Sequence, residues 1–342
     1  MWLDELTSED QACGEIPPVL REIALRKKNG QGSPNSRLGL VIEGGGIRGS
    51  VSGGSLVALS ALGLNHVFDA IYGSSAGAVN GAVFLADQAA MGLTIYMEDL
   101  VSRRCVNPMR FWRIIDLDFI FDDVFRSIKP LDTNAIRQSD TNLHIGLTNV
   151  AGPTAEFLET GTFSGDILTA LKATSALPLL YSKLVTIEGK EYVDGCILSP
   201  LPIRRAFEDG CTHLLVVMAG SRYRRKTPDS PVARMLTRLS IAPRHPGYAR
   251  AFMDRWRVHN EVIDFMNDPS RLPPGTELHV LAPEIDTVQR ATTDAEVIRS
   301  AVERSFREAL VTFKCSPAEI DAMYDDMKES VREHARLAHT TF

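Results

Sequence analysis

Residues 38–49 have the sequence LGLVIEGGGIRG, in which a short apolar run enters directly into a turn with three consecutive glycines. Such a run is typical of a strand that is buried on both faces of a sheet. A second strand, expected over 67–72, leads into the sequence GSSAG at 73–77. Helices are expected after both turns, over 52–62 and 76–86. This βαβα order predicts an α/β fold whose parallel sheet has helices on both faces.

The segment 73–77 fits the pattern G-x-S-x-G, which places a serine on a sharp turn between a strand and a helix. Ser75 is therefore the candidate nucleophile, and Gly73 and Gly77 are the glycines of its turn. The glycine-rich turn offers backbone N–H groups where negative charge develops during acyl transfer. The candidate oxyanion hole consists of Gly44, Gly45, Gly46, Ile47, Arg48 and Gly49. Together the two motifs predict a serine hydrolase.

A serine hydroxyl is a weak nucleophile until a base accepts its proton, and two kinds of base are open to this chain. One is Asp194, which follows a short predicted strand and would serve Ser75 directly. The other is a triad in which Asp194 would act together with His213, His259 or His279. The order of motifs favours the dyad, because the elbow of an α/β-hydrolase follows several strands and Ser75 follows only the second.

Four motifs in this order resemble those of the patatin-like phospholipase family, over residues 37–218. They are the glycine loop at 40–49, the elbow at 73–77, the segment at 173–178 and the sequence YVDG at 192–195, with PLP at 200–202. The resemblance implies a three-layer α/β fold with a central, mostly parallel sheet. It also implies that Ser75 and Asp194 hydrolyse lipid acyl esters through an acyl-enzyme, without a metal or an organic cofactor.

The chain departs from the family at one position beside the expected aspartate. The family usually has Asp-Gly-Gly or Asp-Gly-Ala, whereas this chain has Asp194-Gly195-Cys196. Gly195 keeps the tight turn after the strand. Cys196 is small enough to fit, so we expect the dyad to survive.

Composition limits the class of protein. The chain has 342 residues, 44% of them hydrophobic, and a net charge of -6, which gives no reason to expect nucleic acid as a partner. The cysteines are odd in number and contain no C-x-x-C pair, so neither a disulfide framework nor a zinc site is expected; they are Cys13, Cys105, Cys196, Cys211 and Cys315. There is no secretory-signal pattern and no long apolar run. We therefore expect a cytoplasmic protein whose contact with membranes is peripheral and transient.

Charge is distributed unevenly along the chain. Residues 221–257 contain ten Lys or Arg residues and two Asp residues. Two interpretations are open: a solvated surface of helix and loop, or a docking surface for anionic lipid headgroups.

The expected organisation is an N-terminal extension and linker at 1–36, a catalytic domain at 37–283, and a C-terminal helical extension at 284–342 that packs on it. Further strands are expected over 143–150, 154–159, 213–218 and 277–282, with a hairpin over 183–193. The C-terminal helices are expected at 294–313 and 317–338, and Ser316 and Glu319 form the capping pattern of the second. The aromatic segment 111–125 is expected to form either core or a lid, and its side chains could line an acyl channel.

Other functions also fit parts of the sequence. Gly44, Gly46 and Gly49 satisfy the dinucleotide pattern G-x-G-x-x-G, and Asp69 follows twenty residues later. A ribose-binding acid belongs at the end of the second strand, however, and Asp69 falls near its start. A Ser-Asp-His esterase of α/β-hydrolase type and a non-catalytic lipid-binding module are the remaining alternatives.

Overall fold

The computed structural model describes residues 2–7, 16–107, 109–110, 114–181, 183–286, 288–289 and 292–340. Its strands are β1 (Leu38–Ile42), β2 (Ala70–Ser74), β3 (Asn142–Asn149), β4 (Ala155–Glu159), β5 (Val185–Ile187), β6 (Lys190–Asp194), β7 (His213–Val217) and β8 (Glu277–Leu281). The α-helices are α1 (Trp2–Thr7), α2 (Pro18–Asn29), α3 (Gly49–Ala61), α4 (Ala76–Leu85), α5 (Ala89–Thr94), α6 (Thr133–Gln138), α7 (Ile167–Ser175), α8 (Ile203–Glu208), α9 (Pro231–Ser240), α10 (Pro246–Met266), α11 (Ala295–Thr312) and α12 (Pro317–Thr340). Short 3₁₀ helices are η2 (Gly46–Arg48), η5 (Gly195–Ile197) and η6 (Pro269–Arg271), and the π-helices are η3 (Ile95–Asp99) and η4 (Phe119–Ile128).

These strands form one sheet in the order β5-β6-β3-β2-β1-β7-β8, with β4 paired to β3. The central strands β3, β2, β1, β7 and β8 are parallel, and the antiparallel strands β4, β5 and β6 extend the sheet on the β3 side. Every residue of β1 and β2 is buried, as expected for strands covered on both faces.

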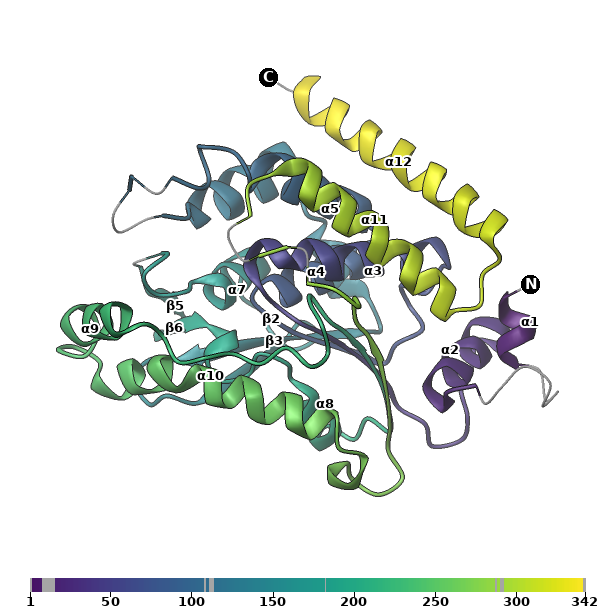
Figure 1. Ribbon diagram of the computed structural model, residues 1–342, viewed down its shortest axis with the longest axis horizontal. Helices are drawn as coiled ribbons and strands as arrows, with labels where there is room; N and C mark the ends of the chain where they lie inside the picture. Colours follow the sequence, from purple (N-terminus) through teal and green to yellow (C-terminus); the bar gives the residue numbers. More distant parts are fainter. Residues whose placement is uncertain are drawn as a thin grey trace.

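Helices cover both faces of this sheet (Figure 1). On one face Leu40 and Ile42 join the core beneath α3, α4 and α11, whereas Val41 points to the opposite face and packs with residues of α8 and α10. The alternation of neighbouring side chains along β1 therefore places one strand in two hydrophobic cores. The prediction of a three-layer α/β fold with a mostly parallel central sheet is confirmed.

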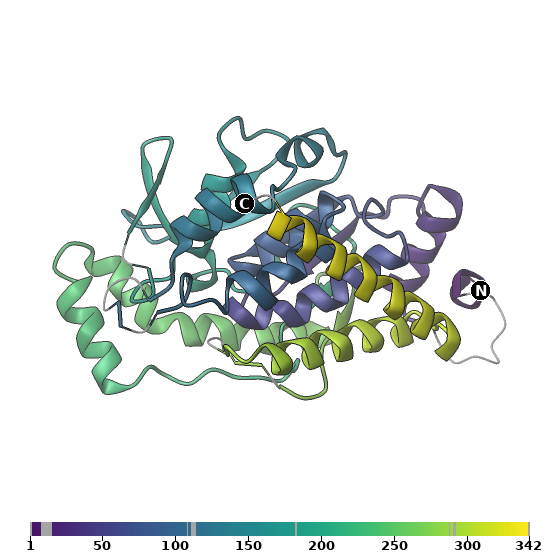
Figure 2. The same ribbon diagram turned by 90° about the horizontal axis from the view of Figure 1, so that it is seen from above.

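The C-terminal helix α11 packs against α3, and α12 packs against α5 (Figures 1 and 2). The contact with α3 is close because a Cβ at Gly54 would lie only 2.3 Å from Ser305 Oγ and 2.7 Å from the carbonyl oxygen of Val302. The domain boundaries at residues 37 and 284 remain a proposal. In it, the C-terminal helices share the hydrophobic core of the catalytic domain. None of the helices in the described ranges combines the length and the apolar composition that a membrane crossing requires.

The second strand begins later than its pattern indicates, at Ala70 rather than at residue 67. Arg26 of α2 donates to the carbonyl of Val67 and pairs with Asp69, whose carboxylate also accepts from the Leu38 N–H. These contacts hold 67–69 in a turn. For the basic segment 221–257 the sequence indicated helix and loop without helix boundaries, and the structure places α9 there and α10 from Pro246 to Met266.

The capping pattern before α12 forms as predicted. Glu319 accepts from the Ser316 N–H at 2.8 Å, and the Glu319 N–H donates to Ser316 Oγ at 3.4 Å. The hydrogen bond that the carboxylate accepts from the Ser316 N–H, and then the one it accepts from the Ser316 hydroxyl at 2.8 Å, lower the pKa of Glu319 from its usual 4.5.

We predict that Ser316→Ala lowers the free energy of unfolding by about 1 kcal/mol, because it leaves N-terminal amides of α12 without a partner. Urea unfolding followed by circular dichroism measures the change, with Ser330→Ala inside the same helix as the control. The loss should shrink as the pH falls below the usual pKa of Glu319, since the lowered pKa of this carboxylate contributes stability only while it is ionised. An equal loss in both variants would contradict the capping role.

Candidate active site

Ser75 lies on the sharp turn between β2 and α4, beyond the carboxyl end of β2. Its φ of 55° and ψ of -133° form a backbone conformation that L-residues rarely adopt. A Cβ at Gly77 would lie 2.3 Å from the carbonyl oxygen of Ile42, and one at Gly73 would lie 2.6 Å from the Ala78 nitrogen. The turn therefore requires glycine on both sides of the serine, as the elbow motif predicts.

Thr174, in α7, holds the backbone of this turn. Its hydroxyl accepts from the Ser75 N–H at 2.8 Å and donates to the carbonyl oxygen of Gly146 in β3. Thr174 thus connects the nucleophile to the neighbouring strand. Its position within the predicted segment 173–178 was the signal, but the sequence analysis assigned no contact to it.

Asp194 ends β6, and its carboxylate lies beside the serine. Ser75 Oγ donates to Asp194 Oδ2 at 3.1 Å, and the Cys196 N–H donates to Asp194 Oδ1 at 2.8 Å. The backbone of Asp194 is also bonded, to the carbonyl of Ala176 and to the hydroxyl of Thr148. Asp194 is only 3% exposed. The structure therefore brings the two candidate catalytic residues together in a buried setting.

The turn after Asp194 depends on a glycine and accommodates the unusual cysteine. A Cβ at Gly195 would lie 2.0 Å from the carbonyl oxygen of Gly146. Cys196 Sγ lies 3.6 Å from the carbonyl oxygen of Ser74, next to the elbow. The thiol thus fits at this position, while its own N–H bonds to the carboxylate of Asp194.

The glycine loop runs directly past the nucleophile. A Cβ at Gly44 would lie 2.4 Å from the Ser74 carbonyl oxygen and 3.2 Å from the Ser75 Cβ. The next residues border the same cavity as Ser75; they are Gly45, Gly46 and Ile47. Gly46 has a φ of 62°, in the left-handed region that favours glycine. The loop therefore exposes its backbone close to the serine, where a reacting carbonyl oxygen would lie.

A buried ion pair anchors the start of this loop. Arg224 Nη2 donates to Glu43 Oε1 at 2.6 Å, and the Ala219 N–H donates to Glu43 Oε2 at 2.9 Å. Glu43 is 1% exposed. Arg48 is buried as well, with its guanidinium against Gly45, and Gly49 begins α3. The sequence analysis missed Glu43 and Arg224, because no local pattern relates residues so far apart in the chain.

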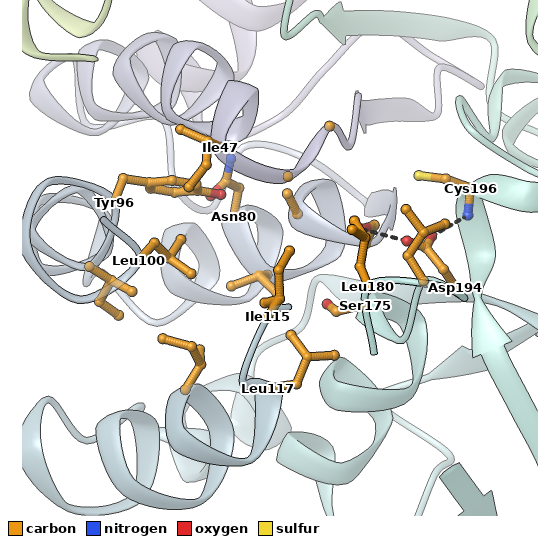
Figure 3. A pocket seen from close by; sticks show the side chains of 18 of the residues that line it. Ile47, Asn80, Tyr96, Leu100, Ile115, Leu117, Ser175, Leu180, Asp194 and Cys196 are labelled. Carbon is orange, nitrogen blue, oxygen red and sulfur yellow. Dashed lines mark hydrogen bonds between the residues drawn. The ribbon is translucent and has the colours of Figure 1, made fainter. Parts of the chain in front are cut away.

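One cavity of about 180 Å³ contains Ser75 and Asp194 in its wall (Figure 3). Its lining is mainly apolar and includes Val83, Ile95, Leu117, Ile120, Phe121 and Phe125, several of them from the π-helices η3 and η4. Segment 111–125 therefore contributes both to the core and to the cavity, as far as it is described. Phe111 and Trp112 lie outside the described residues, as does Cys13.

The histidines considered for a triad lie elsewhere, and none borders the cavity in the described part of the chain. His213 begins β7 and bonds to Thr212, at the end of the sheet away from the elbow. His279 lies within β8. His259 is buried in α10 with Nε2 3.1 Å from the Arg224 carbonyl oxygen, and burial together with the Lys226 charge lowers its pKa to about 2. A base of such low pKa is poorly suited to accept a proton from serine.

The acid considered for dinucleotide binding also lies away from the loop. Asp69 accepts from the N–H of Leu38, at the start of β1, and pairs with Arg26. It therefore occupies the amino-terminal edge of the sheet, opposite the glycine turn. The described residues hold no group of three or more His, Cys, Asp or Glu side chains placed to bind a metal ion.

Tyr248, in α10, is a neighbour of the site that the sequence did not indicate. Its hydroxyl is buried and has no hydrogen-bond partner within the described residues. Burial, and then the negative charge of Asp194, raise the pKa of its phenol. The neutral hydroxyl of Tyr248, on α10, therefore lies in the electrostatic field of the Asp194 carboxylate.

A family model described as "Patatin-like phospholipase" matches residues 40–207. Residues 40–207 of this chain are therefore similar to the patatin-like phospholipase family, over just under half of the chain.

Two individual proteins show the extent of the likeness. The chain is 30% identical over 198 residues to "Uncharacterized protein YjjU" of Escherichia coli strain K12, a match that covers 53% of this chain and 51% of that protein. It thus spans about half the length of this curated relative. The crystal structure of VipD from Legionella pneumophila is similar with a TM-score of 0.41 and 14% identity, over 82% of this chain and 67% of that chain.

We predict that Gly195→Ala destabilises the protein by about 3 kcal/mol, because the added methyl group meets the backbone of Gly146 rather than a movable side chain. Gly152→Ala is the matched control, since no atom lies within 4 Å of its added Cβ. Urea unfolding of both variants measures the difference. Equal midpoints for Gly195→Ala and the wild type would show that β3 and the aspartate turn are not in close contact.

Proposed function

We propose that this chain hydrolyses carboxylic esters of lipids, as a phospholipase A or lysophospholipase, with Ser75 as nucleophile and Asp194 as general base and acid. The observation that carries the proposal is the direct 3.1 Å hydrogen bond between Ser75 Oγ and Asp194 Oδ2 at the wall of an apolar cavity. The match of residues 40–207 to the patatin-like phospholipase family supports the class of reaction. The roles of the individual residues are our inference from the geometry.

In the acylation step, Asp194 accepts the proton of Ser75 while Oγ forms a bond to the ester carbonyl carbon. The carbonyl oxygen becomes an oxyanion that faces the backbone N–H groups of the loop 44–49. One such donor stabilises the transition state by on the order of 3 kcal/mol. The bond to the leaving alcohol then breaks, and Asp194 gives its proton to the departing oxygen.

In the deacylation step, water takes the place of the alcohol. Asp194 accepts a proton from this water as its oxygen attacks the acyl carbon of the ester on Ser75. The bond from the acyl group to Oγ breaks, the fatty acid leaves, and the proton returns to Ser75. The same carboxylate thus acts twice, and the cycle restores the free enzyme.

The cavity indicates how a lipid would lie. Its apolar side chains extend away from Asp194, with Tyr96 and Leu100 on the far side (Figure 3). Lys226 and Arg255 also border it. We infer that the acyl chain enters the apolar part while the polar portion of the substrate stays near these two cations.

The first prediction concerns the dyad. A fluorophosphonate probe should label the wild type and fail to label Ser75→Ala, and Asp194→Asn should lower kcat for a soluble short-chain ester by at least about 10³-fold, because the base is lost. Ser175→Ala is the matched control, since Ser175 borders the same cavity but donates to the Leu171 carbonyl. This control should keep labelling and turnover.

Three outcomes would contradict this function. Labelling of Ser75→Ala at the wild-type rate would place the nucleophile elsewhere. A loss of several orders of magnitude in folded His259→Asn would require an imidazole in the mechanism. Absence of both labelling and lipid hydrolysis in the folded wild type would favour a non-catalytic lipid-binding module.

The second prediction concerns the acyl chain. Leu100→Trp should fill the far side of the cavity and lower kcat/KM for esters of about twelve carbons or more, while a four-carbon ester is hydrolysed as before. Leu100→Met, which nearly conserves volume, is the control. A chain-length series of p-nitrophenyl esters measures the profile. An unchanged profile in Leu100→Trp would mean that the acyl chain lies elsewhere.

A further inference from the structure

Helix α9 turns an apolar stripe toward solvent. The stripe consists of Val232, Met235, Leu236 and Leu239, at the spacing i, i+3, i+4 and i+7, and these side chains are 64%, 54%, 43% and 67% exposed. Thr237, on the other side of the helix, is fully buried. A surface helix normally turns such a stripe to the core, so this orientation leaves the stripe available to another apolar phase.

Four arginines lie on α9 or within ten residues of its end. Arg234 and Arg238 lie on α9, and Arg244 and Arg250 follow on the next turn and on α10. All four are exposed, and no ion pair joins any of them to an acidic group in the described part of the chain. Of the other arginines in the basic segment, Arg224, Arg225, Arg255 and Arg257 each pair with a carboxylate, and Arg222 donates to the Asn267 side-chain carbonyl. Four of the five arginines of the segment that form no ion pair within the described residues thus lie on α9, between the two helices or on the first turns of α10.

The helix is also connected to the cavity. Arg255, which borders the cavity, forms two hydrogen bonds with Asp229, at 2.6 and 2.7 Å. Ser230 follows immediately and caps α9 by accepting from the Ala233 N–H. Both ribbon views place α9 at one end of the molecule, beside α10 (Figures 1 and 2). A membrane surface bound to α9 would therefore lie close to the cavity wall, because the cap of α9 directly follows Asp229, the partner of Arg255.

We propose that α9 is an interfacial docking helix that inserts its apolar stripe into an anionic lipid bilayer, with the four arginines bound to headgroups. An amphipathic helix with an apolar face and a basic polar face is typical of peripheral attachment. The inference rests on the proposed lipid substrate, and it names the surface from which that substrate is taken.

A second copy of the chain is the competing occupant of the same face. Two copies that met through their α9 stripes would bring two sets of unpaired arginines together, and this repulsion disfavours the contact. An anionic bilayer provides both the apolar phase for the stripe and the negative charge for the arginines. The observations therefore favour the bilayer.

Sedimentation with sucrose-loaded vesicles tests the proposal. Ser75→Ala protein is used so that the lipid is not consumed, with vesicles of phosphatidylcholine alone or with phosphatidylglycerol. Binding should occur with the anionic vesicles and weaken with added salt. Met235→Glu combined with Leu239→Glu should lower the partition coefficient at least about tenfold, because two apolar side chains no longer insert. Arg234→Gln and Arg238→Gln should each lower it about fivefold.

Matched controls separate the helix from general surface effects. Val311→Glu changes an apolar side chain that is 60% exposed on α11, and it should bind vesicles as before. Arg21→Gln with Arg304→Gln removes two exposed arginines elsewhere and should also have little effect. Equal loss in the controls and the α9 variants would overturn the assignment of the helix. A dimer that Leu239→Glu dissociates, without vesicle binding, would assign the face to a second copy instead.

A parallel assay separates this inference from the proposed function. The α9 changes, placed in the otherwise wild-type chain, should leave hydrolysis of a soluble short-chain ester unchanged and lower hydrolysis of vesicle lipid. Vesicle binding without any esterase activity would support the docking helix and contradict the catalytic proposal. Esterase activity without vesicle binding would support the catalytic proposal and contradict the docking helix.

Discussion

The site depends on how closely four backbone segments meet around Ser74. A Cβ at Gly44 would lie 2.4 Å from its carbonyl oxygen, and one at Gly146 would lie 2.3 Å from its Oγ. A Cβ at Gly195 would lie 2.0 Å from the Gly146 carbonyl oxygen. Protein interiors are packed too densely to absorb such overlaps. Any of these methyl groups would move the glycine loop, β3 or the aspartate turn, and with it the distance between the Ser75 hydroxyl and the Asp194 carboxylate.

The same packing holds the strained backbone of the nucleophile. A non-glycine residue in such a conformation costs about 1–3 kcal/mol, and it persists only where the surroundings fix it. At Ser75 the N–H is bonded to Thr174 and the hydroxyl to Asp194, while Gly77 lies against the end of β1. These contacts come from α7, β6 and β1, which are separate in sequence. Folding of the whole sheet therefore sets the direction of the serine hydroxyl before substrate arrives.

The features that the sequence could predict depend on local contacts, and those that it could not predict depend on long-range contacts. The strand β1, its glycine turn and the elbow lie in short stretches whose composition requires a particular backbone, so their patterns were sufficient. The strand carrying Asp194 was predictable from its turn and from the family motif. The ion pair between Glu43 and Arg224 could not be predicted, because the sequence does not show that two charged residues so far apart along the chain lie close together in space. The true start of β2 was missed for the same reason, since Arg26 holds the preceding residues in a turn.

Periodicity along α9 shows a related limit. The spacing of Val232, Met235, Leu236 and Leu239 identifies an apolar stripe but does not say whether the stripe faces a core or solvent. Only the fold, which buries Thr237 instead, decides this. The orientation also bears on the energetics of a lipid substrate. Transfer of an acyl chain from a bilayer into water costs about 0.8 kcal/mol for each CH₂, so a chain of sixteen carbons would meet a barrier of more than about 10 kcal/mol. If α9 rests in the bilayer beside the cavity, the chain can pass from lipid to the apolar lining without that exposure, and the enzyme then extracts its substrate at the membrane surface rather than from solution.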